Sequence, residues 1–188
     1  SSQIFDAQTL KSIVKIIKEY LELKIQVSIV VGAGNIWRGK LAKEIGLEVE
    51  DADYMGMVAT VINAAALKSI LIEDGVSAEV LSALAVEKVA KKYTKEEAVE
   101  LLNKGTVVIF AAGTGKPFYT TDTCAAMRAI DIDADVLLMA KDGVDGVYTS
   151  DPRYNKDAKF ISKTTYEELI TLQVQVMDQK ALMLLKES

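Results

Sequence analysis

Three short segments rich in glycine, threonine or aspartate carry the residue types best suited to phosphate chemistry. The segment 113–121 opens with Gly-Thr-Gly and supplies the hydroxyls of Thr114, Thr120 and Thr121. Backbone N–H groups of such a turn can bind one anion, and a helix that starts directly after it adds the positive end of its dipole. The segment lacks the Walker A sequence G-x-x-x-x-G-K-[ST], which leaves another kind of anion site or a plain capped helix start.

The segment 32–39 combines small residues with a fixed positive charge. Gly32, Ala33 and Gly34 allow a ligand to approach the backbone, and the guanidinium of Arg38 matches phosphate oxygens. The glycine spacing does not complete the G-x-G-x-x-G pattern of dinucleotide-binding folds. The alternative is an ordinary tight turn between a strand and a helix, with Arg38 on the surface.

The segment 141–152 is rich in glycine and aspartate. Lys141 follows a predicted strand and could neutralise a phosphate, while Asp145 and Asp151 could orient groups or hold Mg²⁺ through water. Tyr148 could pack on a nucleotide base. The twelve-residue EF-hand pattern is not matched, because no glutamate closes the segment. The alternative is a hairpin turn whose carboxylates are solvated.

A further carboxylate, that of Asp53, lies near the start of a long predicted helix. It could accept a hydrogen bond from a ribose hydroxyl. Carboxylates also favour helix N-termini through the helix dipole alone, and this is the alternative. The apolar side chains that follow along the helix are interpreted as core or interface packing.

Hydrophobic periodicity predicts the elements that position these segments. Helical spacing and capping sequences predict helices over 6–23 and 51–73, from Thr94 to near 105, from Thr121 or Asp122, from Thr165, and from 177 onward. Short apolar runs predict buried strands over 25–31, 77–81, 106–111 and 135–140. This alternation predicts an α/β fold, a three-layer α/β/α sandwich with a largely parallel sheet. Ligands bind such sheets beyond the carboxyl ends of the strands, where all three segments are expected.

The composition excludes several classes of function. The chain of 188 residues has no histidine and one cysteine, which excludes histidine-based triads, histidine-based zinc sites and an intrachain disulfide. Its net charge of −5, without a long basic run, disfavours a nucleic-acid surface. No apolar run reaches the ~18 residues of a membrane span and no signal peptide is visible, so we expect a cytoplasmic protein without a membrane segment.

Taken together, these segments closely resemble the bacterial UMP kinases of the amino acid kinase superfamily. The combination of Gly-Thr-Gly-x-Pro-Phe-x-Thr-Thr-Asp with Val-Asp-Gly-Val-Tyr-x-x-Asp-Pro is specific to that family. The matching stretches occur in the family's order and spacing over nearly the whole chain, at 31–39, 53–60, 113–122, 143–152 and 176–178.

The resemblance implies the amino acid kinase fold and transfer of the γ-phosphoryl group of ATP to UMP, with Mg²⁺ carried by ATP. It also implies a homohexamer built from dimers and control by the effectors UTP and GTP. It assigns contacts with UMP to Ala33, Asp53, Gly113, Thr114, Gly115, Lys116, Pro117, Phe118, Tyr119 and Thr120. It assigns contacts with ATP to Gly34, Arg38, Asp142, Tyr148 and Asp151.

The charges that would act in catalysis are those of Arg38 and Lys141. Phosphoryl transfer depends mainly on positioning and on stabilising negative charge. We predict that Arg38 bridges to the transferring group and that Lys141 lies beside the ATP phosphates.

The chain departs from the family pattern in three places. It lacks the family's first strand, which carries Lys-x-Ser-Gly, and the family's C-terminal strand, so we expect a single domain over 1–188 that is truncated at both ends. The UMP-binding part is expected over about 1–135 and the ATP-binding part over about 136–188. Ala33 stands where the family usually has glycine, and the added methyl leaves its N–H intact.

Two other functions stay open at this point. One is another enzyme of the superfamily, an acetylglutamate, carbamate or aspartate kinase, although those lack the threonine-rich segment described above. The other is a non-catalytic nucleotide-binding or storage protein on the same scaffold.

Overall fold

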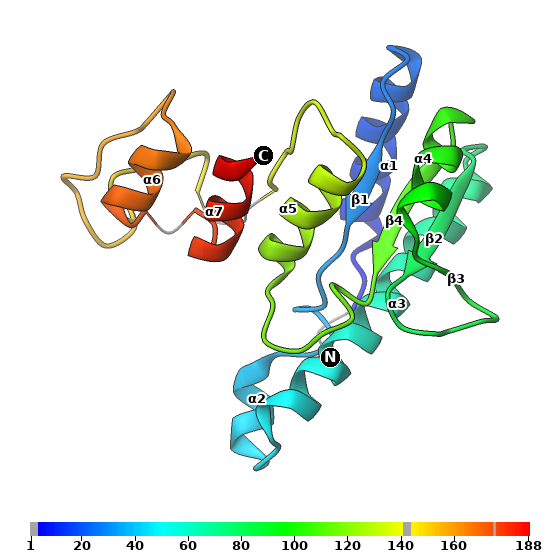
Figure 1. The fold of residues 1–188 in the computed structure, drawn as a ribbon, viewed down its shortest axis with the longest axis horizontal. Helices are drawn as coiled ribbons and strands as arrows, with labels where there is room; N and C mark the ends of the chain where they lie inside the picture. Colours follow the sequence, from blue (N-terminus) through cyan, green and yellow to red (C-terminus); the bar gives the residue numbers. More distant parts are fainter. Residues whose placement is uncertain (1–3, 141–143, 175) are drawn as a thin grey trace. The chain divides into compact units, whose positions relative to one another are not determined.

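The structure is a computed structural model that describes residues 4–140, 144–174 and 176–188. It divides into two compact units, residues 1–121 and 122–188 (Figure 1). The first unit contains a four-stranded sheet with helices on both faces. The second unit contains three helices and a long connection between the first two of them.

The sheet of the first unit is parallel, with the strand order β1-β4-β2-β3. Its strands are β1 (Ser28–Val30), β2 (Ala78–Ser82), β3 (Lys91–Lys92) and β4 (Val107–Ala111). Every residue of β4 is buried, as expected for an apolar run in the centre of a parallel sheet. Ile29 pairs with Ile109 on one side of β4, and Val80 pairs with Ile109 on the other. The carboxyl ends of β1 and β4 therefore lie at the same edge.

Helices cover both faces of this sheet. They are α1 (Ala7–Glu22), α3 (Val49–Glu73) and α4 (Lys95–Asn103), whereas α2 (Gly39–Glu44) packs on α3. Side chains of α1 and α3, among them Val14 and Leu71, share one core with Ile109 of β4. The side chain of Phe110, the next residue of β4, lies on the other face, where its ring meets Tyr93 edge-on at 5.6 Å. Helix α4 lies beside β4 (Figure 1). The predicted three-layer α/β/α arrangement with a parallel sheet is confirmed.

The helix ends follow the capping residues of the sequence. Asp6 accepts hydrogen bonds from the N–H groups of Gln8 and Thr9 at the start of α1. Thr94 accepts from the N–H of Glu97 at the start of α4. The helices predicted over 6–23 and 51–73 and from Thr94 are thereby confirmed, with ends shifted by one or two residues.

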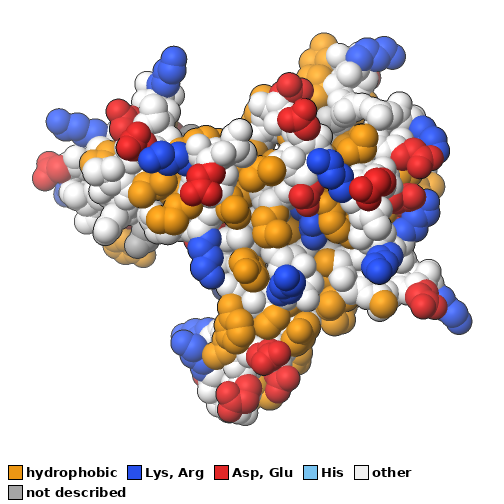
Figure 2. Space-filling model, in the orientation of Figure 1, with side chains coloured by type: hydrophobic (Ala, Val, Ile, Leu, Met, Phe, Trp, Pro, Cys, Tyr) orange, Lys and Arg blue, Asp and Glu red, His pale blue; other side chains and the backbone are white. Residues whose placement is uncertain are grey.

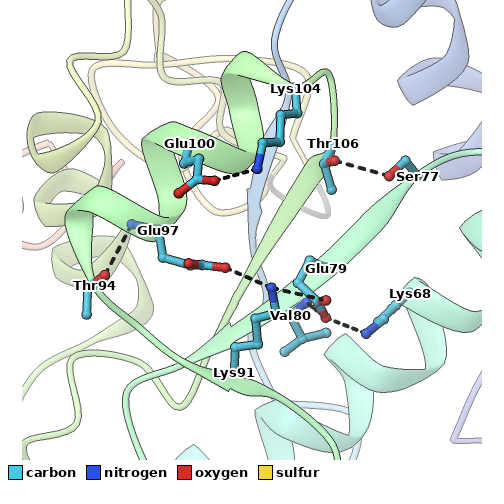
Figure 3. Close-up of polar contacts among 10 residues, drawn as sticks. All are labelled: Lys68, Ser77, Glu79, Val80, Lys91, Thr94, Glu97, Glu100, Lys104 and Thr106. Carbon is cyan, nitrogen blue, oxygen red and sulfur yellow. Dashed lines mark hydrogen bonds and ion pairs between the residues drawn. The ribbon is translucent and has the colours of Figure 1, made fainter.

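An ion-pair network joins the sheet to helices on its two faces (Figure 3). The carboxylate of Glu79 on β2 accepts a hydrogen bond from Lys68 of α3 and from the N–H of Val80. Lys91 of β3 lies 4.0 Å from Glu79 and 2.8 Å from Glu97 of α4. Burial alone would raise the pKa of Glu79, but the hydrogen bonds from Lys68 and Val80 and the nearby lysine charges outweigh it and lower that pKa.

Helix α3 is long and apolar enough, by length and composition alone, to cross a membrane. This differs from the sequence expectation that no stretch of the chain reaches that length. In the structure, 39% of the most apolar 18-residue stretch of this helix is buried. Ala64, Leu67 and Leu71 pack in the core of the first unit. The helix therefore acts here as a core element of the α/β layer structure.

The second unit packs its helices around a small core of its own. They are α5 (Thr121–Asp131), α6 (Tyr166–Leu172) and α7 (Gln179–Glu187). Ala126, Leu169 and Leu182 are among the buried side chains of this core. Thr165 forms a complete capping box with Glu168, and Asp178 caps α7 while it accepts the hydroxyl of Thr123 at 2.9 Å. The helices predicted from Thr121, Thr165 and 177 are confirmed.

The strand predicted over 135–140 is wrong, because these residues belong to no strand of the structure. Val136 and Leu138 are 69% and 68% exposed, whereas Leu137 and Met139 pack on the core of the second unit. An apolar run favours a strand only where a neighbouring strand supplies ladder hydrogen bonds. No such ladder is present for 135–140 among the described residues.

Two short elements were not predicted, α2 and β3. The first turn of α2 has no side-chain cap, because Arg38 at the N-cap carries only hydrogen-bond donors and cannot accept from the helix N–H groups. Exposed hydrophobic side chains gather over α2 and the start of α3, namely Leu41, Ile45 and Val49, beside acidic side chains (Figure 2). A short exposed helix with this pattern gives little signal in the sequence.

Candidate functional site

A hollow of about 330 Å³ lies at the carboxyl ends of β1 and β4, against the first half of α3. Three segments line it, one after each of these strands and one on the helix. Among the residues predicted to contact nucleotides, the lining includes Ala33, Gly34, Asp53, Gly113, Thr114, Lys116, Tyr119 and Thr120. The structure thus brings the segments 32–39 and 113–121 together with Asp53. Gly115, Pro117 and Phe118 belong to the same loop but not to the lining.

The turn 112–115 begins directly after β4 and has an unusual backbone. Ala112, Gly113 and Gly115 have positive φ angles of +61°, +54° and +77°. The N–H of Gly115 donates to the carbonyl of Ala112 at 3.0 Å, and the φ signs at Gly113 and Thr114 are those of a type II′ turn. Such a turn exposes backbone N–H groups at its tip, which suits an anion.

Gly115 is the most confined position of this turn. A Cβ atom there would lie 3.1 Å from the Cβ of Ala83 and 3.2 Å from its carbonyl oxygen. Ala83 follows β2, so the end of a second strand supports the turn. At Gly113 the nearest atom would be Cγ of Met57 at 3.9 Å, and only the φ angle favours glycine. The side chain of Thr114 closes the tip by bonding to the backbone of Lys116.

Two side chains of α3 hold the loop 112–120 at its two ends. The hydroxyl of Thr60 accepts the N–H of Ala112 at 2.7 Å. The carboxylate of Asp53 accepts the N–H of Phe118, also at 2.7 Å. Phe118 has a φ of +68°, so both bonded residues are non-glycine residues in the left-handed region. Asp53, predicted to bond a ribose hydroxyl, therefore also orders the loop.

The loop 31–38 is held by its own polar groups and by α3. Asn63 of α3 donates to the carbonyl of Gly32 at 2.7 Å and pairs its amide reciprocally with that of Asn35. The indole N–H of Trp37 donates to the carbonyl of Ala52 at 2.9 Å. The Nε of Arg38 donates to the carbonyl of Gly34 at 2.8 Å, and Arg38 is exposed outside the lining of the hollow.

The second unit carries the other predicted nucleotide residues on the connection that precedes α6. The hydroxyl of Tyr148 donates to Asp145 at 2.9 Å, a bond that raises the pKa of Tyr148. The guanidinium of Arg153 binds the carboxylate of Asp151 at 2.7 Å and lowers its pKa. Antiparallel backbone bonds join residues 147–149 to 159–161, so part of this segment forms one arm of a hairpin.

An open hollow of about 540 Å³ lies in the same unit. Its lining comprises Val144, Asp145, Pro152 and Arg153. Lys141 and Asp142, predicted to act on ATP, lie outside the described residues. Within the described ranges, no group of three or more aspartate, glutamate, histidine or cysteine side chains could hold a metal ion.

The model of the amino acid kinase family matches residues 1–188, the whole length of the chain. The chain belongs to the amino acid kinase family. Among the curated members, a protein named uridylate kinase from Mycoplasmopsis pulmonis (strain UAB CTIP) is 45% identical over 184 residues, which are 97% of this chain and 76% of that protein.

Solved structures of other members are similar throughout. The crystal structure of UMP kinase from Ureaplasma parvum matches with a TM-score of 0.94 and 42% identity, covering all of this chain and 79% of that one. The crystal structure of UMP kinase from Bacillus anthracis matches with a TM-score of 0.94 and 41% identity, over 97% and 75% of the two chains. The α/β fold of this member of the amino acid kinase family therefore agrees with that of the solved members.

Nine residues that line the hollow were not among the predicted ligand contacts, and two of them are Trp37 and Thr60. Trp37 stands beside Arg38 in the first loop, and Thr60 lies on α3. The interval from Asp53 to Thr60 is seven residues, which places both on one face of a helix after two turns. That spacing was visible in the sequence, but the partner on the loop was not.

Proposed function

We propose that the protein transfers the γ-phosphoryl group of ATP to UMP and releases UDP and ADP. The observation that carries this proposal is the hollow at the carboxyl edge of the sheet, where two glycine-containing loops and Asp53 meet. The identity of 41–45% with proteins named uridylate or UMP kinase supports it further. The sequence similarity to a uridylate kinase extends over 97% of the chain. It therefore also argues against an acetylglutamate, carbamate or aspartate kinase and against a storage protein.

UMP occupies this hollow in the proposal. Its phosphate lies on the N–H groups at the tip of the turn 112–115. The remaining contacts come from Ala33, Asp53 and residues 116–120. Polar atoms of this loop distinguish UMP from CMP, since a site built to bond one set of donors and acceptors leaves a mispaired group unsatisfied.

The residues proposed to contact ATP are those that the resemblance assigns to it, Gly34, Arg38, Asp142, Tyr148 and Asp151. Arg38 and Lys141 are the proposed catalytic cations. The contact of Arg38 with Gly34 uses Nε, whereas a fork-like contact with phosphate oxygens uses the terminal nitrogens. We further propose a UMP-binding part over about 1–135, to which Gly34 and Arg38 also belong, and an ATP-binding part over about 136–188.

Mg²⁺ is proposed to enter with ATP, because this ion usually keeps several waters and binds substrate phosphates with few protein carboxylates. A cytoplasmic location, a homohexamer built from dimers and control by UTP and GTP complete the proposal. Each comes from the resemblance to UMP kinases, and size-exclusion chromatography with light scattering tests the hexamer directly.

The reaction is tested by a coupled assay of ADP release with MgATP and a panel of acceptors. We expect release that depends on UMP and is at least tenfold slower with CMP. Release that depends on acetylglutamate, carbamate or aspartate would support the other kinases of the superfamily. Binding of ATP with no turnover on any acceptor would support a nucleotide-binding protein.

The role of Arg38 is tested by Arg38→Ala, with Arg38→Lys as the matched variant that keeps one charge. We expect the alanine variant to lose about 10²–10³-fold in kcat/KM, as when one preorganised donor is removed from a transition state. Unchanged kcat/KM would remove Arg38 from the mechanism.

Thr120→Ala should relax selection between UMP and CMP. Retained selection would count against the proposed contact of Thr120 with the base.

A further inference from the structure

Ala112 is the residue on which the conformation of the turn 112–115 depends. It follows the last residue of β4, and its φ of +61° is rarely adopted by alanine. Its carbonyl accepts the N–H of Gly115 at 3.0 Å, which closes the turn. Its N–H donates to the hydroxyl of Thr60 at 2.7 Å. Both backbone groups of Ala112 are therefore engaged, one inside the turn and one on α3.

Thr60 is well suited to hold this N–H. Its side chain is buried, with 7% of the residue exposed, so water competes little for the bond. The same hydroxyl donates to the carbonyl of Met57 at 2.7 Å, one turn earlier on α3. Because the hydroxyl hydrogen of Thr60 is donated to Met57, the oxygen lone pairs are left to accept a hydrogen bond from the loop. A hydroxyl fixed in this way has one orientation, donating to Met57 and accepting from Ala112.

The other end of the loop has an equivalent support. Asp53, seven residues before Thr60, accepts the N–H of Phe118, whose φ is +68°. The two acceptors lie on one face of α3, two turns apart. Between these two residues, Met57 of α3 lies next to Gly113. A Cβ atom added to Gly113 would lie 3.9 Å from Cγ of Met57. Helix α3 thus contacts the beginning, the tip and the end of the same loop.

The geometry points to Thr60 as a positioning residue for the acceptor site. Its hydroxyl holds Ala112 in the left-handed region and so presents the N–H groups at the tip of the turn to the phosphate of UMP. Thr60 acts through Ala112 and not through a bond to the nucleotide. The inference rests on the proposed function for the identity of the ligand, but the bond between Thr60 and Ala112 is a property of the protein alone.

The experiment compares Thr60→Val, which keeps the shape and removes the hydroxyl, with Thr60→Ser, which keeps the hydroxyl. We expect Thr60→Val to raise both Kd and KM for UMP about tenfold, the effect of one buried N–H left without its partner. KM for ATP should stay within twofold. Thr60→Ser should restore KM for UMP to within about twofold of wild type.

Hydrogen exchange of the unliganded full chain gives a readout that needs no substrate. In Thr60→Val the amide of Ala112 should exchange at least tenfold faster than in wild type, while the amide of Ile109 in the centre of β4 stays unchanged. Equal protection of Ala112 in the two proteins would overturn the inference. So would an unchanged KM for UMP in Thr60→Val, provided that wild type phosphorylates UMP.

Leu71→Val is the matched control for a general loss of stability. Leu71 is fully buried on α3, three turns beyond Thr60, and lies outside the lining of the hollow. We expect this variant to unfold at lower urea concentration with KM for UMP unchanged. An equal rise of KM in Leu71→Val and Thr60→Val would show a merely structural role and overturn the inference. If wild type fails to phosphorylate UMP but the exchange result holds, the proposed function fails and the bond to Ala112 stands.

Discussion

The loop 112–120 of the first unit and the hairpin 147–161 of the second are held in different ways. Ala112 and Phe118 bond to α3 side chains that lie 52 and 65 positions earlier in the chain. In the hairpin, Tyr148 bonds to Asp145 and Arg153 bonds to Asp151, across three and two positions. The first loop therefore takes its shape from the tertiary fold, and the second from its own sequence.

This difference indicates how each region would meet a ligand. A loop fixed by distant elements loses little conformational entropy on binding, so its preorganisation favours selectivity for a small acceptor. A hairpin held by local bonds can change partners with little cost to the rest of the unit. Substitutions should accordingly act over long distances in the first loop and only nearby in the second.

The largest expected effect is that of Gly115→Ala. The variant combines a φ of +77° with a Cβ only 3.1 Å from Ala83, and strain and overpacking together should cost about 2–4 kcal/mol of unfolding free energy. KM for UMP should rise more than tenfold. Urea unfolding and initial rates measure the two effects.

Gly113→Ala and Gly34→Ala are the controls for this prediction. Gly113 has a φ of +54° but no close neighbour, so alanine should cost about 1–2 kcal/mol. At Gly34 nothing lies within 4 Å of an added Cβ, and stability should change by less than about 0.5 kcal/mol. Equal stability of all three variants would contradict the view that the turn is held by β2.

The next largest effect separates the two loops directly. Asp53→Ala should raise KM for UMP about tenfold, because the N–H of Phe118 loses its acceptor and a proposed ribose contact is removed. Asp151→Ala removes the carboxylate that Arg153 binds nearby in the chain, together with a proposed ATP contact. KM for UMP should therefore stay within twofold, while KM for ATP rises. A similar rise of KM for UMP in both variants would remove the distinction between the loops.

A smaller effect concerns the ion pairs that support the first unit (Figure 3). The pKa of Glu79 lies below its ordinary value of 4.5, so its ionised form stabilises the fold above that value and this contribution is lost as pH falls through the lowered pKa. Glu79→Gln should lower the free energy of unfolding by about 1–2 kcal/mol at pH 7. The difference from wild type should shrink below pH 4.5.

The exposed pair of Glu100 and Lys104 provides the matched control. Both side chains are more than half exposed, so solvent screens their attraction. Glu100→Gln should leave the unfolding curve at pH 7 unchanged within error. A pH profile of Glu79→Gln that runs parallel to that of wild type would show that Glu79 is not the group that titrates.

The smallest effect is confined to the hairpin. The hydrogen bond to Asp145 raises the pKa of Tyr148 above its ordinary value of 10.0. Asp145→Asn removes the negative charge, and the pKa of Tyr148 should fall toward that value. A ¹³C NMR titration of the labelled tyrosines measures this shift. The amides of 112–118 should keep their chemical shifts, and their movement would indicate coupling that the structure does not predict.

Local signals in the sequence were sufficient for much of the fold. Asp6, Thr94 and Thr165 each cap a helix, and the apolar run at 107–111 forms the central strand. The run at 135–140 looks similar in sequence and forms no strand, because strand formation also requires a neighbour, which a single sequence does not reveal. Glycine-containing turns were found, since their residue types reflect local φ requirements.

Side-chain partners across the fold were harder to predict. Asp53 was expected to contact a ribose. Its hydrogen bond with the N–H of Phe118 could not be predicted, because it depends on how the fold brings a loop 65 positions away next to α3. Thr60 was part of a matching stretch and was interpreted only as part of the helix. The contact of Arg38 with Gly34 arises within one tight loop and had no distinguishing pattern.

Trp37 gives this protein a built-in optical reporter. It is the single tryptophan of the chain, it lines the hollow, and its indole is fixed by the carbonyl of Ala52. Excitation at a wavelength that tyrosine does not absorb therefore produces emission from one place only, beside the proposed acceptor. Quenching on addition of UMP would follow filling of that hollow in real time, without a label and without a signal from the second unit.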